Sequence, residues 1–253
     1  MIYRTITKII KAFFGSILLL VLTPWTNSQT ICSLKDKNLE KCLVNSVQGV
    51  IPVLVKGLPK YGVFPLDPLH IDILDLSDAP GKTLNVKHKF KNVDLFGLQS
   101  TNVRKVSVNK KKTEIRVDAI MKEPITLTGF YESEGKLLSF PIKGDGRFNI
   151  TLVNLKAALT MSGHEIKKNN KIYIHMDTVR FPFTVDRLLL NFENLLKGNK
   201  EISESLNNIL NENWEPILDD MRDSFESAIG AAFKEIANRV FSKVPVSDLI
   251  KDY

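Results

Sequence analysis

Residues 206–240, LNNILNENWEPILDDMRDSFESAIGAAFKEIANRV, decide the fold because they carry one continuous apolar stripe at helical spacing. From Leu206 to Val240 successive apolar residues are three, four or one apart, the pattern of a helix with one buried face. At 1.5 Å per residue this helix is roughly 50 Å long. Ser203 is a plausible N-cap, and Pro216 predicts either a short helix before a long one or one bent helix.

The partner of this helix is predicted between residue 70 and about residue 192, where the apolar period changes to two. Ile115 and Val117, for example, alternate with Arg116 and Asp118, and turn signals such as residues 133–136 separate the runs. This pattern is typical of an antiparallel sheet with one apolar face. An isolated coiled coil is disfavoured because the helical stripe lacks a strict seven-residue repeat.

These two elements together predict an α+β fold in which a highly curved antiparallel sheet wraps a long C-terminal helix. Imperfect filling of the space between them would leave an elongated apolar cavity, or tunnel, suited to a lipid-like molecule. Composition alone leaves open whether this space is filled or hollow.

The N-terminal segment predicts export. Three basic residues precede the apolar run 12–22, which has the length of a signal-peptide core and is short for a transmembrane helix. Small residues at Thr26 and Ser28 place cleavage near Ser28, which leaves one domain over residues 29–253. The alternative is an uncleaved anchor that starts at Ile9.

The composition and charge argue against a nucleic-acid partner. The chain has 253 residues, 43% of them hydrophobic, and a net charge of +7, which falls to +4 without residues 1–28. Its short lysine runs at 110–112 and 167–168 are interpreted as solvated turns, so no nucleic-acid partner is expected. Weak, at most transient contact with an anionic membrane remains open.

The first helix of the mature chain is predicted to follow Asn38 and to end at Lys56-Gly57, with Pro52 as a kink or a mark of its last turns. Cys32 and Cys42 lie just before it and within its first turn. In an oxidising compartment a bridge between them would stabilise the chain by about 2–3 kcal/mol.

No catalytic or metal-binding pattern is present in the sequence. There is no Gly-x-Ser-x-Gly elbow, and the four histidines lack metal-ligand spacing, so neither an enzyme nor a cofactor is expected. His88 and Tyr131 lie on apolar strand faces, where each is either structural or a contact for the polar end of a ligand. Asn149 begins the sequon Asn-Ile-Thr on the solvated strand face and is predicted to be glycosylated.

Several segments occur in the order typical of one family. They are the early cysteine pair, GLP at 57–59 with GVFPLDPL at 62–69, PIKGDG at 141–146 with ITL at 150–152, NLLKGNK at 194–200, and LNENW at 210–214. With these motifs the chain from Cys32 to about Leu249 resembles the takeout / juvenile-hormone-binding protein family of secreted insect proteins.

The resemblance implies a tubular lipid-binding fold with a tunnel between helix and sheet, a Cys32–Cys42 disulfide, and no enzymatic activity. Implied ligands are juvenile hormone, terpenoids or fatty-acid-like molecules, carried in insect haemolymph or another extracellular fluid, with circadian or feeding-related roles in the family. Because no second disulfide can form in the C-terminal half, the takeout branch is favoured. The tunnel is expected to be lined by Leu43, Val47, Leu54, His88, Phe90, Leu127, Tyr131, Phe140, Phe148, Phe181, Phe183, Trp214, Leu218, Met221, Phe225 and Phe233.

Three functions compete at this point. The first is a secreted carrier of a small hydrophobic ligand, for which any receptor is unknown. The second is a membrane- or lipopolysaccharide-engaging defence protein, which predicts a concentrated basic tip. The third is a lipid hydrolase, which needs a catalytic triad that the sequence does not contain.

Overall fold

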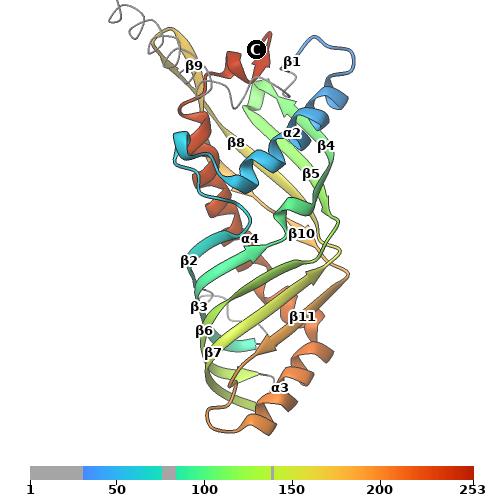
Figure 1. Cartoon of the computed structure of the whole chain (residues 1–253), viewed down its shortest axis with the longest axis vertical. Helices are drawn as coiled ribbons and strands as arrows, with labels where there is room; N and C mark the ends of the chain where they lie inside the picture. The colour runs from blue at the N-terminus through green and yellow to red at the C-terminus, as the bar shows by residue number, and fades with distance from the viewer. Residues whose placement is uncertain (1–30, 76–83, 138–139) are drawn as a thin grey trace, which may run out of the picture.

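A computed structural model describes residues 31–75, 84–137 and 140–253 and has the shape of an elongated body with a sheet at each end (Figure 1). The predicted signal segment 1–28 lies outside the described residues. One sheet has the strand order β11-β7-β6-β3-β2, and the other the order β10-β8-β5-β4 with β9 paired to β8. The predicted fold class is confirmed, but most of the described strands divide between two large sheets where the sequence suggested one.

The first sheet, named here the β6 sheet, has an inner face of alternating apolar residues. Its strands are β2 (Leu69–Asp75), β3 (Leu84–Phe96), β6 (Ile125–Leu137), β7 (Phe140–Val153) and β11 (Arg187–Phe192), and all neighbouring strands are antiparallel. The turn predicted at residues 133–136 is wrong. Those residues pair with β3 on one side and β7 on the other, so the hydrogen-bond ladder overrides their turn propensity.

The second sheet, named the β5 sheet, contains both lysine runs of the sequence. Its strands are β4 (Thr101–Asn109), β5 (Glu114–Met121), β8 (Lys156–Lys168), β9 (Lys171–Arg180) and β10 (Phe183–Thr184). A short 3-10 turn, Lys110–Lys112, joins β4 to β5, and Asn169 and Asn170 turn β8 into β9 with positive φ angles. The interpretation as a hairpin turn is therefore confirmed for Lys110–Lys112, whereas Lys167 and Lys168 are the last residues of β8 and pair with β9 just before the turn.

The C-terminal stripe forms two helices, the first of the two predicted alternatives. Helix α3 (Lys200–Glu212) ends and α4 (Trp214–Phe241) begins at Asn213. Pro216 lies in the first turn of α4, where backbone N–H groups have no hydrogen-bond acceptor within the helix. The missing N–H of proline therefore costs no helical hydrogen bond at this position. The predicted cap at Ser203 is wrong, because Asn199 caps α3 by accepting a hydrogen bond from the Ile202 amide at 3.0 Å.

Helix α2 (Leu39–Lys56) has the predicted bounds, with Pro52 inside it and Gly57 beyond its last residue at φ +83°. The expected cap at Asn38 is not formed, because the Asn38 side chain makes no capping hydrogen bond. The Cys32–Cys42 disulfide is present and ties this helix to β1 (Cys32–Ser33). Strand β1 pairs in parallel with β12 (Ile250–Lys251), so the first and last strands meet at one end of the molecule (Figure 1).

Amide side chains attach each helix to an edge strand. Asn211 on α3 accepts from the Leu190 amide at 2.9 Å and donates to the Leu190 carbonyl at 2.7 Å, and Asn207 does the same with Phe192. Asn238 on α4 bonds Met176 of β9 in this way, while Gln48 on α2 bonds the Thr101 carbonyl and the Val103 amide of β4. Each amide therefore replaces the neighbouring strand that an edge lacks.

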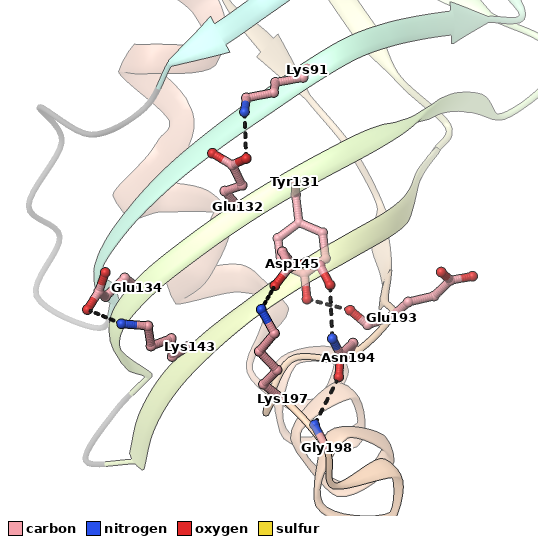
Figure 2. A network of polar contacts seen from close by, with 10 residues as sticks. All are labelled: Lys91, Tyr131, Glu132, Glu134, Lys143, Asp145, Glu193, Asn194, Lys197 and Gly198. Atoms are coloured by element: carbon pink, nitrogen blue, oxygen red, sulfur yellow. Dashed lines mark hydrogen bonds and ion pairs between the residues drawn. The ribbon is translucent and has the colours of Figure 1, made fainter.

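The motif PIKGDG has a structural role where residues 193–196 cross β7 (Figure 2). A Cβ on Gly144 would collide with the Asn194 carbonyl, and one on Gly146 would lie 2.9 Å from the Glu193 carbonyl. The Tyr131 hydroxyl donates to that same Glu193 carbonyl at 2.5 Å, and burial raises the pKa of this tyrosine far above its usual value. An ion pair between Lys197 and Asp145, 3.0 Å long, lies over the crossing.

Candidate ligand-binding site

The inner face of the β6 sheet and helices α3 and α4 enclose a small apolar cavity of about 80 Å³, named here the inner cavity. His88 is the one polar residue among the described residues that line it. The other lining residues are Leu95, Leu98, Met121, Ile125, Leu127, Ile142, Ile150, Leu152, Leu155, Phe181, Phe183, Leu188, Leu190, Phe192, Leu195, Leu210, Ile217, Leu218, Met221, Phe225, Ile229 and Phe233.

A larger cavity of about 420 Å³, named the outer cavity, lies between α2, the β5 sheet, α4 and the C-terminal segment. Its volume is within the range of about 300–1,000 Å³ usual for small-molecule sites. Most of its wall is aliphatic, with a few polar residues such as Ser46, Thr113, Glu114 and Tyr253. Burial raises the pKa of Tyr253 to about 12, so its hydroxyl is uncharged at neutral pH.

The two cavities adjoin. Leu98, Met121, Phe181 and Phe233 line both of them, and the rings of Phe181 and Phe233 lie 5.5 Å apart between centroids. We name this place the neck. Together the cavities provide apolar space on both sides of the neck.

Few apolar residues of α2 and α4 are fully buried, which indicates a hollow interior. None of the residues of α2, all of which the structure describes, is fully buried, although its apolar side faces the protein. In the 28 residues of α4 only Ile217, Leu218, Ile229 and Gly230 are buried, while Met221, Phe225 and Phe233 keep accessible surface. An apolar stripe that packs against neighbours and still has accessible surface borders empty space.

The structure places the predicted tunnel residues in three groups. His88, Leu127, Phe183, Leu218, Met221 and Phe225 line the inner cavity, Leu43, Val47 and Leu54 line the outer cavity, and Phe181 and Phe233 line both. Phe90, Tyr131, Phe148 and Trp214 are not among the described side chains on either wall. The side chain of Phe140 lies outside the described part of the chain. Contact of any of these residues with a ligand stays a prediction.

The residues that lie off the walls have other roles. Phe90, Tyr131 and Phe148 are almost fully buried and form an aromatic cluster with Phe192, in which Phe90 and Phe148 meet edge to face at 4.8 Å. Trp214 lies under the guanidinium of Arg187 at 5.7 Å. Alternation places a residue on the inner face of a strand, but it does not distinguish packed core from cavity wall.

Sequence reasoning missed several wall residues. The alternation of Leu188, Leu190 and Phe192 in β11 was a usable signal for the inner face. Leu98 lies in the 3-10 turn Leu98–Ser100 and Met121 at the end of β5, where no period marks a residue as facing inward.

His88 has an unusual environment for a histidine. It is 7% exposed, and its Nδ1 lies 2.6 Å from the Ser133 hydroxyl oxygen. Burial lowers its pKa to about 4, so the ring is neutral at physiological pH. Its Nε2 is buried away from water and has no hydrogen-bond partner among the residues that the structure describes.

Within the described residues no group of histidine, cysteine and acidic side chains could hold a metal ion. No described helix is long and apolar enough to cross a membrane. What this arrangement offers chemically is a buried apolar surface with one neutral imidazole.

A long helix and two large antiparallel sheets surround adjoining apolar cavities, an arrangement suited to binding a hydrophobic molecule. The chain belongs to the haemolymph juvenile hormone binding protein (JHBP) family, whose sequence model matches residues 16–251. This family is one of binding proteins, and the resemblance drawn from the sequence motifs is confirmed.

Individual relatives agree with this assignment. The crystal structure of Epiphyas postvittana Takeout 1 has a TM-score of 0.76 and 28% identity, covering 90% of this chain and 100% of that one. The circadian clock-controlled protein daywake of Drosophila yakuba is 23% identical over 226 residues, 87% of this chain and 86% of daywake. A Schistocerca gregaria protein named "Putative beta-carotene-binding protein" is 31% identical over 118 residues, 47% of this chain and 46% of that protein.

Proposed function

We propose that the protein is a secreted carrier that holds a small hydrophobic ligand in its adjoining cavities and releases it chemically unchanged. The observation that carries the proposal is the apolar space of about 80 and 420 Å³ beneath α2 and α4. Each methylene moved from water into such space contributes about 0.8 kcal/mol before ordering costs. The proposed ligands are a juvenile-hormone-like terpenoid, a fatty acid or a similar lipid.

Family membership and the absence of any catalytic arrangement in the sequence support a carrier over an enzyme. The relative from Schistocerca gregaria is named for an apolar ligand, beta-carotene, which extends the range of lipids to be tested. No observation favours the membrane- or lipopolysaccharide-engaging function that the sequence left open.

Secretion and glycosylation form part of the same proposal. A disulfide between Cys32 and Cys42 and a family described from haemolymph support an extracellular protein whose single domain spans residues 29–253 after signal cleavage. Asn149 is exposed on β7, and its side-chain oxygen accepts from the Thr151 hydroxyl at 3.1 Å, which leaves its amide nitrogen accessible for a glycan. Loss of mass on treatment with an N-glycosidase, absent in Asn149→Gln, tests this site.

Native mass spectrometry of protein purified from its natural source tests the carrier function. The expected result is a mass excess that an organic solvent extracts and that a lipid standard matches. A ligand-free mass, together with failure to bind any hydrophobic probe, would overturn the proposal. Tight binding to anionic liposomes without ligand uptake would favour the membrane-engaging function in its place.

A further inference from the structure

His88, which lines the inner cavity, has an unpaired polar atom that packing does not explain. Of the described residues on its wall, His88 alone has a side chain that forms strong hydrogen bonds, and its Nε2 has no partner. Leaving a buried polar atom without a hydrogen bond destabilises a fold, and native proteins rarely do so without a functional reason. The ring is also fixed in place, since it stacks on Phe90 with centroids 5.9 Å apart and bonds Ser133.

The bond to Ser133 assigns the proton of the neutral imidazole. If Nδ1 donated to Ser133, the serine hydroxyl hydrogen and the Nε2 lone pair would both lack a partner among the described groups. If the Ser133 hydroxyl donates to Nδ1, only the Nε2–H group remains unpaired. The second arrangement leaves fewer buried polar groups unsatisfied, so Nε2 is a hydrogen-bond donor.

We propose that His88 determines ligand specificity by donating a hydrogen bond from Nε2–H to an acceptor oxygen at one end of the ligand. This inference rests on the proposed carrier function and adds the chemical class of the ligand. The ligand is an elongated lipid with a terminal carbonyl, ester or ether oxygen. Its oxygen lies in the inner cavity, and its chain passes between Phe181 and Phe233 into the outer cavity.

The orientation of the ligand follows from the polarity and size of the two cavities. The inner cavity is too small, at about 80 Å³, for a whole lipid chain, whereas the outer cavity has about 420 Å³. His88 is the one polar wall residue described at the inner end. Since Nε2 has almost no accessible surface in the ligand-free protein, binding requires a neighbouring wall side chain to change rotamer.

The test compares three competitors of equal chain length, tetradecane, the corresponding methyl ketone and tetradecanol, in displacing an apolar fluorophore from the intact protein. The variants are His88→Phe, which removes the donor, and His88→Gln, which keeps an amide N–H near the same place. The matched control is His70→Phe, the same substitution at a half-exposed residue of β2 in the same sheet. The wild-type protein is expected to bind the ketone about three- to tenfold more tightly than the alkane, the effect of one hydrogen bond.

The variants separate His88 from the polar residues of the outer cavity. His88→Phe should bind ketone and alkane equally, while His70→Phe and, in part, His88→Gln should keep the preference for the ketone. If His88→Phe does not fold, imidazole ¹⁵N shifts of the wild-type protein report whether the ketone bonds Nε2–H.

Three results would overturn the inference. A preference for the alcohol without one for the ketone shows that Nε2 accepts, and equal binding of ketone and alkane by the wild-type protein shows that His88 is structural. A ketone preference that survives in His88→Phe assigns the contact to another residue. Failure of the wild-type protein to bind any of the three compounds contradicts the carrier function itself, so the two failures are distinguishable.

Discussion

Filling the outer cavity by mutation tests whether it is empty space in the ligand-free protein. Ala237 on α4 lines this cavity, and Ala237→Phe adds a ring there. In a solid interior such overpacking costs about 1–3 kcal/mol. Here the unfolding free energy of ligand-free protein should change by less than about 1 kcal/mol, because the ring enters space that already exists.

Ligand affinity, unlike the unfolding free energy, should fall strongly in Ala237→Phe. At about 30 Å³ for a carbon-sized group, 420 Å³ holds about 14 such groups, and the added ring takes nearly half of that space. Displacing about six carbons at about 0.8 kcal/mol each loses about 5 kcal/mol of gross burial. Since part of the ligand can shift, we expect affinity to fall by at least about a hundredfold.

Urea unfolding of delipidated protein and fluorophore displacement measure the two effects. Ala231→Phe is the matched control, since Ala231 is an exposed residue of the same helix and lies on neither described wall. The control variant should change neither the unfolding free energy nor the ligand affinity. Destabilisation of Ala237→Phe by about 1–3 kcal/mol or more with unchanged affinity would refute the reasoning, because it would mean that the space is filled and the ligand is elsewhere.

Three further predictions concern stability. Burial lowers the pKa of His88 to about 4, below about 6.5 in the unfolded chain, so the unfolded state binds more protons between these values. This histidine should therefore remove up to about 3 kcal/mol of unfolding free energy as the pH falls from about 7 to about 4, and urea unfolding of His88→Gln should show a smaller loss. Asn211→Leu removes both hydrogen bonds to Leu190 and should cost about 1–3 kcal/mol by urea unfolding, against no change for the exposed Asn208→Leu. Gly144→Ala should cost more than about 2 kcal/mol because its Cβ meets the backbone of Asn194 and Leu195, whereas Gly49→Ala, with open space in α2, should raise the melting temperature by stabilising the helix by about 1 kcal/mol.

Periodicity predicted the elements of this fold better than their ends. Apolar spacing gave α2, the strands and the stripe of α3 and α4, because each buries one face along its whole length. The ends depend on single side chains and on pairing. Asn199 and not Ser203 caps α3, and residues 133–136 extend a strand because two neighbours pair with them.

The residues that line the cavities could be predicted from the sequence less well than the fold. The alternation along a strand determines whether a side chain faces inward. Whether that side chain lines a cavity depends on whether side chains from the facing elements pack against it. Phe90 and Phe148 pack on each other and Phe225 borders the cavity, although each lies on the apolar face of its strand or helix. Nor does any sequence period reveal that Gln48, Asn207, Asn211 and Asn238 bond strand edges.

Those four amides have a consequence for a protein that we propose to be secreted into an extracellular fluid. Unpaired strand edges recruit further copies of a chain and start fibrils, and β4, β9 and β11 are three such edges. Because helices occupy them through side-chain amides, the molecules can remain dispersed without a charged barrier along each strand. Loss of one amide should then shorten shelf life at high concentration, even in a variant whose melting curve is close to that of the wild-type protein.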